Sequence, residues 1–209
     1  MKKIEGGVTA AKGYEAAGIA SGIRKNGRTD MAIVYSQVPC KAAGTFTTNV
    51  VKAAPVKWDQ NVVYNQPNAQ AVVVNAGIAN ACTGEEGMGY CKATAEKVAE
   101  LLKVPAEQVL VASTGVIGQP LDTTPISDAM PELVKILDSE RGSLAAEAIM
   151  TTDTKPKEIA FEFEIGGKVC HIGGIAKGSG MIHPNMATML VFVTSDVNIS
   201  PEMLQKALS

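Results

Sequence analysis

Residues 177–190 read KGSGMIHPNMATML and run directly into the apolar segment VFV. Two glycines and a proline favour an irregular loop, whereas residues 189–193 have the apolar composition of a strand. Thr188 is therefore expected to stand at the first residue of a core strand, directly after an unusual loop.

Upstream of this stretch the chain alternates between strand and helix signals. Residues 71–75 and 109–112 are short β-branched runs typical of buried strands, and residues 88–102 place apolar side chains three and four apart, as a helix does. Residues 158–165 alternate Ile and Phe with Glu before Gly166-Gly167 and a second run to Ile175, which predicts a hairpin. Further helices are expected at residues 131–137 with Pro131 in the first turn, at 143–149 capped by Ser143, and from Ser200-Pro201-Glu202 onward.

Composition and charge exclude several classes of protein. The 209 residues are 46% apolar, enough for a real core, and the net charge of −2 comes without a Lys/Arg cluster for nucleic acid. No signal-peptide core and no 18-residue apolar run occur, so we expect a soluble, cytoplasmic protein that contacts no membrane. Four dispersed cysteines and two separated histidines, His171 and His183, argue against a structural zinc or any other metal.

The string KGSGMIxPNMATML resembles the processing site of ornithine acetyltransferases, also called glutamate N-acetyltransferases. Blocks at residues 18–19, 44–49 and 75–84 also look like family blocks, so the resemblance covers the chain end to end. It implies an α/β fold with the layered sheet-and-helix architecture of self-processing, Thr-nucleophile (Ntn-like) enzymes. It also implies cleavage between Ala187 and Thr188, with residues 1–187 as the α-chain region and 188–209 as the start of a β chain whose remainder is absent.

The chemistry fits these residue types. A Thr hydroxyl needs a nearby base, and cleavage before Thr188 would supply one as an α-amine with a pKa of about 7.7–8.0. In the uncleaved chain, the Thr188 hydroxyl would attack the Ala187 carbonyl and form an ester by an N-to-O shift. Water would then hydrolyse this ester.

The resemblance assigns further roles. It makes Thr114 and Gly115 the oxyanion hole, at the end of a buried strand, and it makes Lys177 and Thr151 substrate-binding residues. Thr152 is a competitor for the role of Thr151. Alone, Thr114-Gly115 would be an ordinary strand-end turn and Lys177 a solvated lysine. His183 is expected to be structural, and the glycines of 173–180 lack the spacing of a phosphate loop.

The implied reaction moves an acetyl group from N-acetylornithine to Thr188 and then to glutamate, in arginine biosynthesis. No cofactor is implied, although acetyl-CoA is a possible acetyl donor, and the expected assembly is a heterotetramer of two α and two β chains. Two alternatives stay open. One is a self-processed, aminopeptidase-like amidohydrolase, in which water is the acceptor; the other is a truncated or split subunit without turnover.

Overall fold

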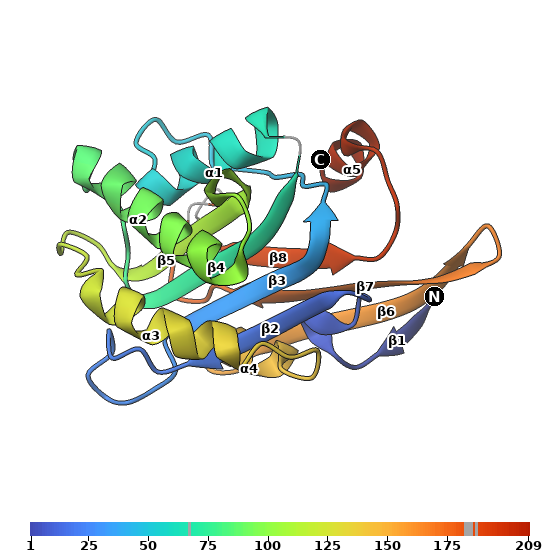
Figure 1. Cartoon of the computed structure of the whole chain (residues 1–209), viewed down its shortest axis with the longest axis horizontal. Coiled ribbons are helices and arrows are strands. Elements are labelled where there is room, and N and C mark those ends of the chain that lie inside the picture. Colours follow the sequence, from blue (N-terminus) through green and yellow to red (C-terminus); the bar gives the residue numbers. More distant parts are fainter. Residues whose placement is uncertain (67, 182–185, 187) are drawn as a thin grey trace.

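The computed structural model describes residues 1–66, 68–181, 186 and 188–209, which form two stacked four-stranded sheets with helices (Figure 1). The strands are β1 Lys2–Ile4, β2 Tyr14–Ile19, β3 Met31–Cys40, β4 Ala69–Ile78, β5 Val109–Val116, β6 Lys157–Ile165, β7 Lys168–Lys177 and β8 Leu190–Ser195. The helices are η1 Gly7–Thr9, α1 Ala54–Asn65, α2 Gly84–Leu102, η2 Ala106–Gln108, α3 Thr124–Lys135, α4 Gly142–Ala148 and α5 Pro201–Leu208.

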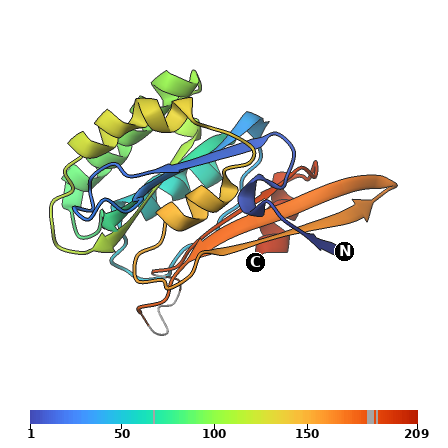
Figure 2. The ribbon, with the colours of Figure 1, turned by 90° about the horizontal axis from the view of Figure 1, so that it is seen from below.

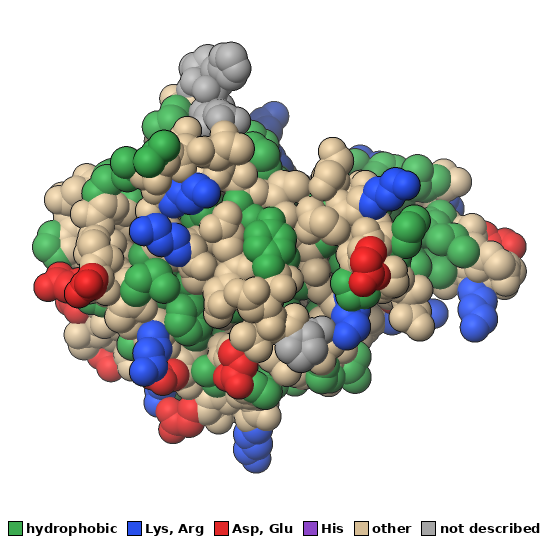
Figure 3. Space-filling view, turned by 90° about the horizontal axis from the view of Figure 1, so that it is seen from above, with side chains coloured by type: hydrophobic (Ala, Val, Ile, Leu, Met, Phe, Trp, Pro, Cys, Tyr) green, Lys and Arg blue, Asp and Glu red, His purple; other side chains and the backbone are tan. Residues whose placement is uncertain are grey.

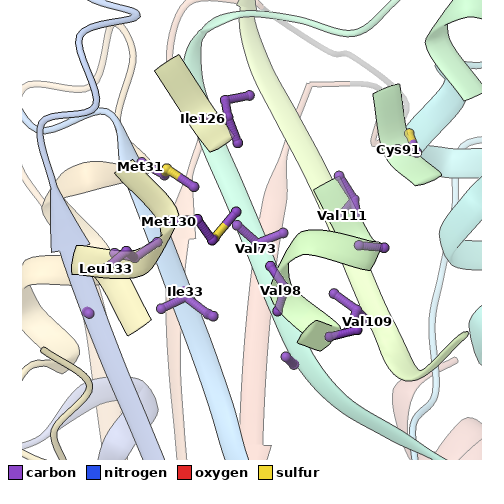
Figure 4. Close-up of a cluster of buried hydrophobic side chains, with 14 of the residues drawn as sticks. Met31, Ile33, Val73, Cys91, Val98, Val109, Val111, Ile126, Met130 and Leu133 are labelled. Carbon is purple, nitrogen blue, oxygen red and sulfur yellow. The ribbon is translucent and has the colours of Figure 1, made fainter. Parts of the chain in front are cut away.

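The first sheet has the strand order β2-β3-β4-β5, with β4 and β5 parallel and the other pairs antiparallel. Helices α1, α2 and α3 cover its outer face (Figure 2). Val98 of α2 and Met130 and Leu133 of α3 pack onto Ile33 and Val73 of the strands, forming one buried core (Figure 4). Strand-loop-helix alternation in the sequence therefore corresponds to a sheet with its helices on one side.

The second sheet has the order β1-β6-β7-β8 and is antiparallel throughout. It stacks on the inner face of the first sheet, with η1 and α4 packed between them (Figure 2). A second core fills this layer, and its buried members include Val34, Val74, Ile149 and Ile175. The molecule thus has a helix layer and two sheet layers, which is the layered α/β architecture that the family resemblance implies.

Register explains why only one face of the second sheet is buried. Ala160, Gly173 and Thr194 lie in one cross-strand row that faces inward, where Gly173 allows Gly7 of η1 to approach closely. The alternate rows face outward. Ile159, Gly174 and Val193 form one of these rows, and Lys157, Ala176 and Val191 another. Val193 is 55% exposed and Ile159 48%.

A groove of about 490 Å³ follows these outward rows, because Gly174 and Ala176 are small residues between larger ones. Its lining is mainly apolar and includes Ile159, Phe161, Val191 and Val193. The described part of the chain therefore leaves one apolar sheet face uncovered.

Three local predictions are wrong. Pro131 lies inside α3, which begins at Thr124 with Pro125 in its first turn, because Ile126, Met130 and Leu133 extend the buried stripe toward the N-terminus. Ser143 does not cap α4; it is the second helical residue, and its hydroxyl bonds the Glu158 carboxylate.

The third correction concerns β8, which begins at Leu190, two residues after Thr188. It is the edge strand of its sheet and is alternately exposed, so it is not a core strand. The predicted hairpin is present as β6 and β7, and Ser200 caps α5 by accepting a hydrogen bond from the Met203 N–H (3.3 Å).

On the face seen in Figure 3, Lys and Arg side chains are interspersed with Asp and Glu. No helix among the described residues is long and apolar enough to cross a membrane. The four cysteines are unpaired, and Cys91 is fully buried.

Candidate active site

Thr114 and Lys177 meet where the two sheets lie against each other. Thr114 is near the end of β5 in the first sheet, and Lys177 is the last residue of β7 in the second. Lys177 pairs with Leu190, a member of the inter-sheet core, so its side chain points inward and is only 6% exposed. Its Nζ donates a hydrogen bond to Thr114 Oγ1 (3.1 Å). The stacking of the sheets thus assembles two of the predicted site residues.

Gly115 lies opposite Gly77 in the parallel pair β4 and β5, at the same end of the sheet. Both glycines have positive φ angles, 133° at Gly115 and 143° at Gly77, which disfavour other residues. A Cβ at Gly115 would clash with the Gly77 carbonyl. Glycine is therefore required at position 115 by both conformation and space.

Thr188 lies in a turn and is partly buried. It precedes Leu190 by two residues, and Leu190 pairs with Lys177, so the backbone register places Thr188 at the Lys177 end of the second sheet. Ala187, the other residue of the predicted cleavage bond, and His183 lie outside the described residues.

The segment that follows α4 contacts the loop that follows Lys177. The buried carboxylate of Asp153 accepts hydrogen bonds from the Gly178 N–H (2.8 Å) and the Thr151 N–H (3.2 Å), and it forms an ion pair with Lys157. Thr152 contributes its hydroxyl, which lies 3.0 Å from Ser179 Oγ. In this cluster Thr151 contributes only its backbone N–H.

Two cations and one carboxylate act on the charge of Lys177. Burial lowers the pKa of Lys177, the charge of Asp153 raises it, and the nearby cations Lys157 and Arg24 lower it. Arg24 also reaches the Met150 carbonyl, directly before Thr151. A partly desolvated group of cations is suited to binding a carboxylate.

Two residues of this cluster, Asp153 and Arg24, were not predicted as site residues. Asp153 belongs to the same TTDT stretch as Thr151, so its proximity was a usable signal, but nothing local marks Arg24, 126 residues before Met150. Within residues 1–66, 68–181, 186 and 188–209, no three His, Cys, Asp or Glu side chains are grouped as metal ligands.

Residues 15–209 match the model of the ArgJ family. The chain is 52% identical over 210 residues to the arginine biosynthesis bifunctional protein ArgJ of Thermosynechococcus vestitus, covering 99% of this chain and 50% of that protein. It is 52% identical over 200 residues to the ArgJ protein of Gloeobacter violaceus, covering 96% and 49%. The chain therefore spans about half the length of these relatives.

Solved structures agree with the sequence matches. ArgJ from Bacillus halodurans superposes with a TM-score of 0.81 at 38% identity, covering 90% of this chain and 97% of the solved one. Ornithine acetyltransferase from Mycobacterium tuberculosis, solved in complex with ornithine, also superposes with a TM-score of 0.81, at 39% identity. The match covers 90% of this chain and 99% of the solved one. An Ochrobactrum anthropi aminopeptidase described as a variant Ntn hydrolase fold gives 0.57 at 12% identity, a likeness of fold alone.

Proposed function

This chain belongs to the ArgJ family, and from that premise we propose that it forms the nucleophile-bearing half of an acetyltransferase that moves an acetyl group from N-acetylornithine to glutamate. The observation that carries the proposal is the contact between Lys177 and Thr114, at the end of the sheets where Thr188 precedes β8. It brings a cation and a hydroxyl together at the end of the sheets at which the Thr188 segment leads into β8.

The first step is self-cleavage between Ala187 and Thr188. The Thr188 hydroxyl attacks the Ala187 carbonyl, the amide becomes an ester, and water releases Thr188 with a free α-amine. That amine then serves as the base for the same residue's hydroxyl, because its pKa of about 7.7–8.0 leaves an unprotonated fraction at neutral pH.

Acetyl transfer follows in two balanced steps. The Thr188 oxygen attacks the acetyl carbonyl of N-acetylornithine while the α-amine takes the hydroxyl proton. The proton then passes to the departing ornithine amine as the C–N bond breaks. The neutral amine of glutamate attacks the carbonyl of the resulting acetyl ester. The ester C–O bond breaks, and one proton of that amine passes through the Thr188 α-amine to the Thr188 oxygen, which leaves N-acetylglutamate and a free hydroxyl. Acetyl-CoA would enter as an alternative donor at the first step.

Thr114 and Gly115 supply the oxyanion donors in this mechanism. Thr114 Oγ1 accepts a hydrogen bond from Lys177, and this bond does not use the hydroxyl hydrogen of Thr114. That hydrogen can therefore be donated to the oxyanion. The loss of one such donor typically costs about 10² to 10³ in rate. Lys177 additionally offers positive charge to a substrate carboxylate, as does Arg24 nearby.

Thr151 suits a substrate contact better than Thr152 does. The Thr152 hydroxyl lies within hydrogen-bond distance of Ser179, and its Oγ1 also packs against Gly180. The Thr151 hydroxyl takes no part in those contacts, so it remains for the ligand.

We further propose that the uncovered face of the second sheet binds the polypeptide that corresponds to the second half of the relatives. The face is apolar along the outward rows of Ile159 and Val191, and β8 on its edge begins two residues after Thr188. In this arrangement residues 1–187 form an α chain, residues from 188 onward belong to a β chain, and two of each make a heterotetramer.

Intact mass under denaturing conditions tests the first step, with wild type, Thr188→Ala and Thr188→Ser compared in the presence and absence of the co-expressed second half. Wild type and the Ser variant, which keeps a hydroxyl, should split between residues 187 and 188, and the Ala variant should remain whole. A single uncut mass in wild type under both conditions would refute self-processing.

Incubation with N-acetylornithine, with and without glutamate, tests the transfer. A transferase forms N-acetylglutamate only when glutamate is present, whereas an aminopeptidase-like amidohydrolase releases acetate in either case. If the chain turns over only together with the second half, the activity belongs to the assembled protein and not to this chain alone.

A further inference from the structure

Asp153 lies where two segments that bear candidate site residues meet. Its side chain is fully buried, yet three donors from different positions converge on it. The Gly178 N–H and the Lys157 ammonium bond Oδ1, and the Thr151 N–H bonds Oδ2. One carboxylate therefore connects the turn after α4 with the residue that directly follows Lys177.

A second pair of contacts holds the same two segments together. Thr152 Oγ1 lies 3.0 Å from Ser179 Oγ, and a Cβ on Gly180 would lie 2.8 Å from Thr152 Oγ1. Residues 151–153 and 178–180 thus run side by side, and a displacement of Asp153 would move both.

Asp153 also supplies the negative charge beside Lys177. The charged groups that act on Lys177 are Asp153, Lys157 and Arg24, and Asp153 is the only anion among them. Burial alone would raise the pKa of Asp153, but its bonds with Lys157, Gly178 and Thr151 lower it to about 2. The carboxylate consequently stays charged throughout the physiological range.

We propose that Asp153 is a positioning residue, which fastens the Thr151 turn to Gly178 and holds Lys177 as an ammonium ion directed at Thr114. The catalytic meaning of this role rests on the proposed acetyl transfer, but the structural claim does not. Without the carboxylate, Lys177 would face only cations and the Gly178 N–H would lose its acceptor.

Asp59 provides a matched control. It is a second buried aspartate that accepts a backbone N–H, from Val111 (2.9 Å) in β5. Burial raises the pKa of Asp59 well above its usual range, although the bond from Val111 opposes this. Asp59 is not among the charged groups that act on Lys177, so Asp59→Asn tests the loss of a buried carboxyl group elsewhere in the fold, whereas Asp153→Asn removes the anion that acts on the lysine.

The experiment is NMR on lysine-labelled and amide-labelled protein, with the Lys177 signal assigned by its loss in Lys177→Met. In Asp153→Asn the neutral fraction of Lys177 at a fixed alkaline pH should rise about three- to tenfold, and Gly178 amide exchange should accelerate by a similar factor. Asp59→Asn should change neither quantity. Lys157→Met, which removes a partly exposed cation, should change the neutral fraction of Lys177 in the opposite direction.

A folded Asp153→Asn protein with an unchanged Lys177 titration and unchanged Gly178 exchange would overturn the proposal. If that variant does not fold, Lys157→Met decides, since an unaltered Lys177 titration there would show that the cluster does not control the lysine. None of these readouts requires turnover. Failure of the acetyl transfer assay would therefore leave this result standing, and the reverse also holds.

Discussion

Gly115 and Gly77 face each other across β4 and β5 so closely that a Cβ on Gly115 would lie 2.1 Å from the Gly77 carbonyl oxygen. Real Cβ atoms do not approach that distance, so one of the two backbones would have to move. The movement would displace the Thr114 hydroxyl and the Gly115 N–H together.

Gly115→Ala should therefore lower stability by about 2 kcal/mol or more and reduce acetyl transfer at least 100-fold. Gly118→Ala is the control, because Gly118 also has positive φ (85°) but has no neighbour that a Cβ would meet. It should cost only about 1 kcal/mol, with activity retained. Urea unfolding measures the stability of the two variants, and the transfer assay measures their activity. Equal effects of the two substitutions would contradict the steric argument.

Substitutions of the two neighbouring threonines should differ in their effect on ligand affinity. Thr151→Val should weaken binding of N-acetylornithine about tenfold, because it removes a ligand hydrogen bond. Thr152→Val should leave affinity within about threefold and lower thermal stability, since its hydroxyl lies against Ser179. Isothermal titration with ligand tests this, and a larger affinity loss in Thr152→Val would reverse the assignment.

Acid should weaken the fold through Asp153. Its pKa in the folded protein, about 2, is below the usual 3.8, so its contribution is present above the usual value and is lost as pH falls toward 2. Urea unfolding measures the free energy of unfolding of wild type and Asp153→Asn at pH 5 and at pH 2.5. The difference between the two proteins should be smaller at pH 2.5 by an amount on the order of 1 kcal/mol. If the difference in the free energy of unfolding does not change with pH, the charge of Asp153 contributes nothing to the stability of the fold.

The uncovered sheet face offers a test of association. Val193→Lys, within the groove lining, should abolish binding of the polypeptide that corresponds to the second half of the relatives. Ile165→Lys has nearly the same exposure, 54% against 55%, but lies beside the hairpin turn outside that lining. Co-purification of the two polypeptides should survive only the second substitution, and loss of binding in both would place the interface elsewhere.

Local patterns predicted several of the elements, but they missed β2, β3 and α1 and did not predict which faces are buried. The alternation of Ile and Phe with Glu correctly predicted β6, yet Ala160 is the fully buried residue of that strand while Ile159 and Ile165 are about half exposed. A period of two shows that a strand has two faces; which face is covered depends on packing against α4 and against η1, and η1 lies near the N-terminus, far from β6 in the sequence.

Pro131 illustrates the limit for helices. A proline is favoured in a first turn, and α3 has one there in Pro125, but buried Ile126, Met130 and Leu133 stabilise the helix on both sides of the second proline. Contacts between residues far apart in the sequence could not be predicted from local patterns either. The motif around Thr188 predicted a region of the site, whereas the Lys177–Thr114 contact joins residues 63 positions apart and depends on how the two sheets stack.

The position of β8 at the edge of its sheet affects how the protein can be handled. An edge strand presents a row of backbone N–H and C=O groups without a neighbouring strand, and here Val191 and Val193 add apolar side chains beside that row. Such an edge pairs readily with the same edge of another molecule, which leads to aggregation. Concentration, storage temperature and the timing of co-expression therefore bear on whether the purified chain stays monodisperse.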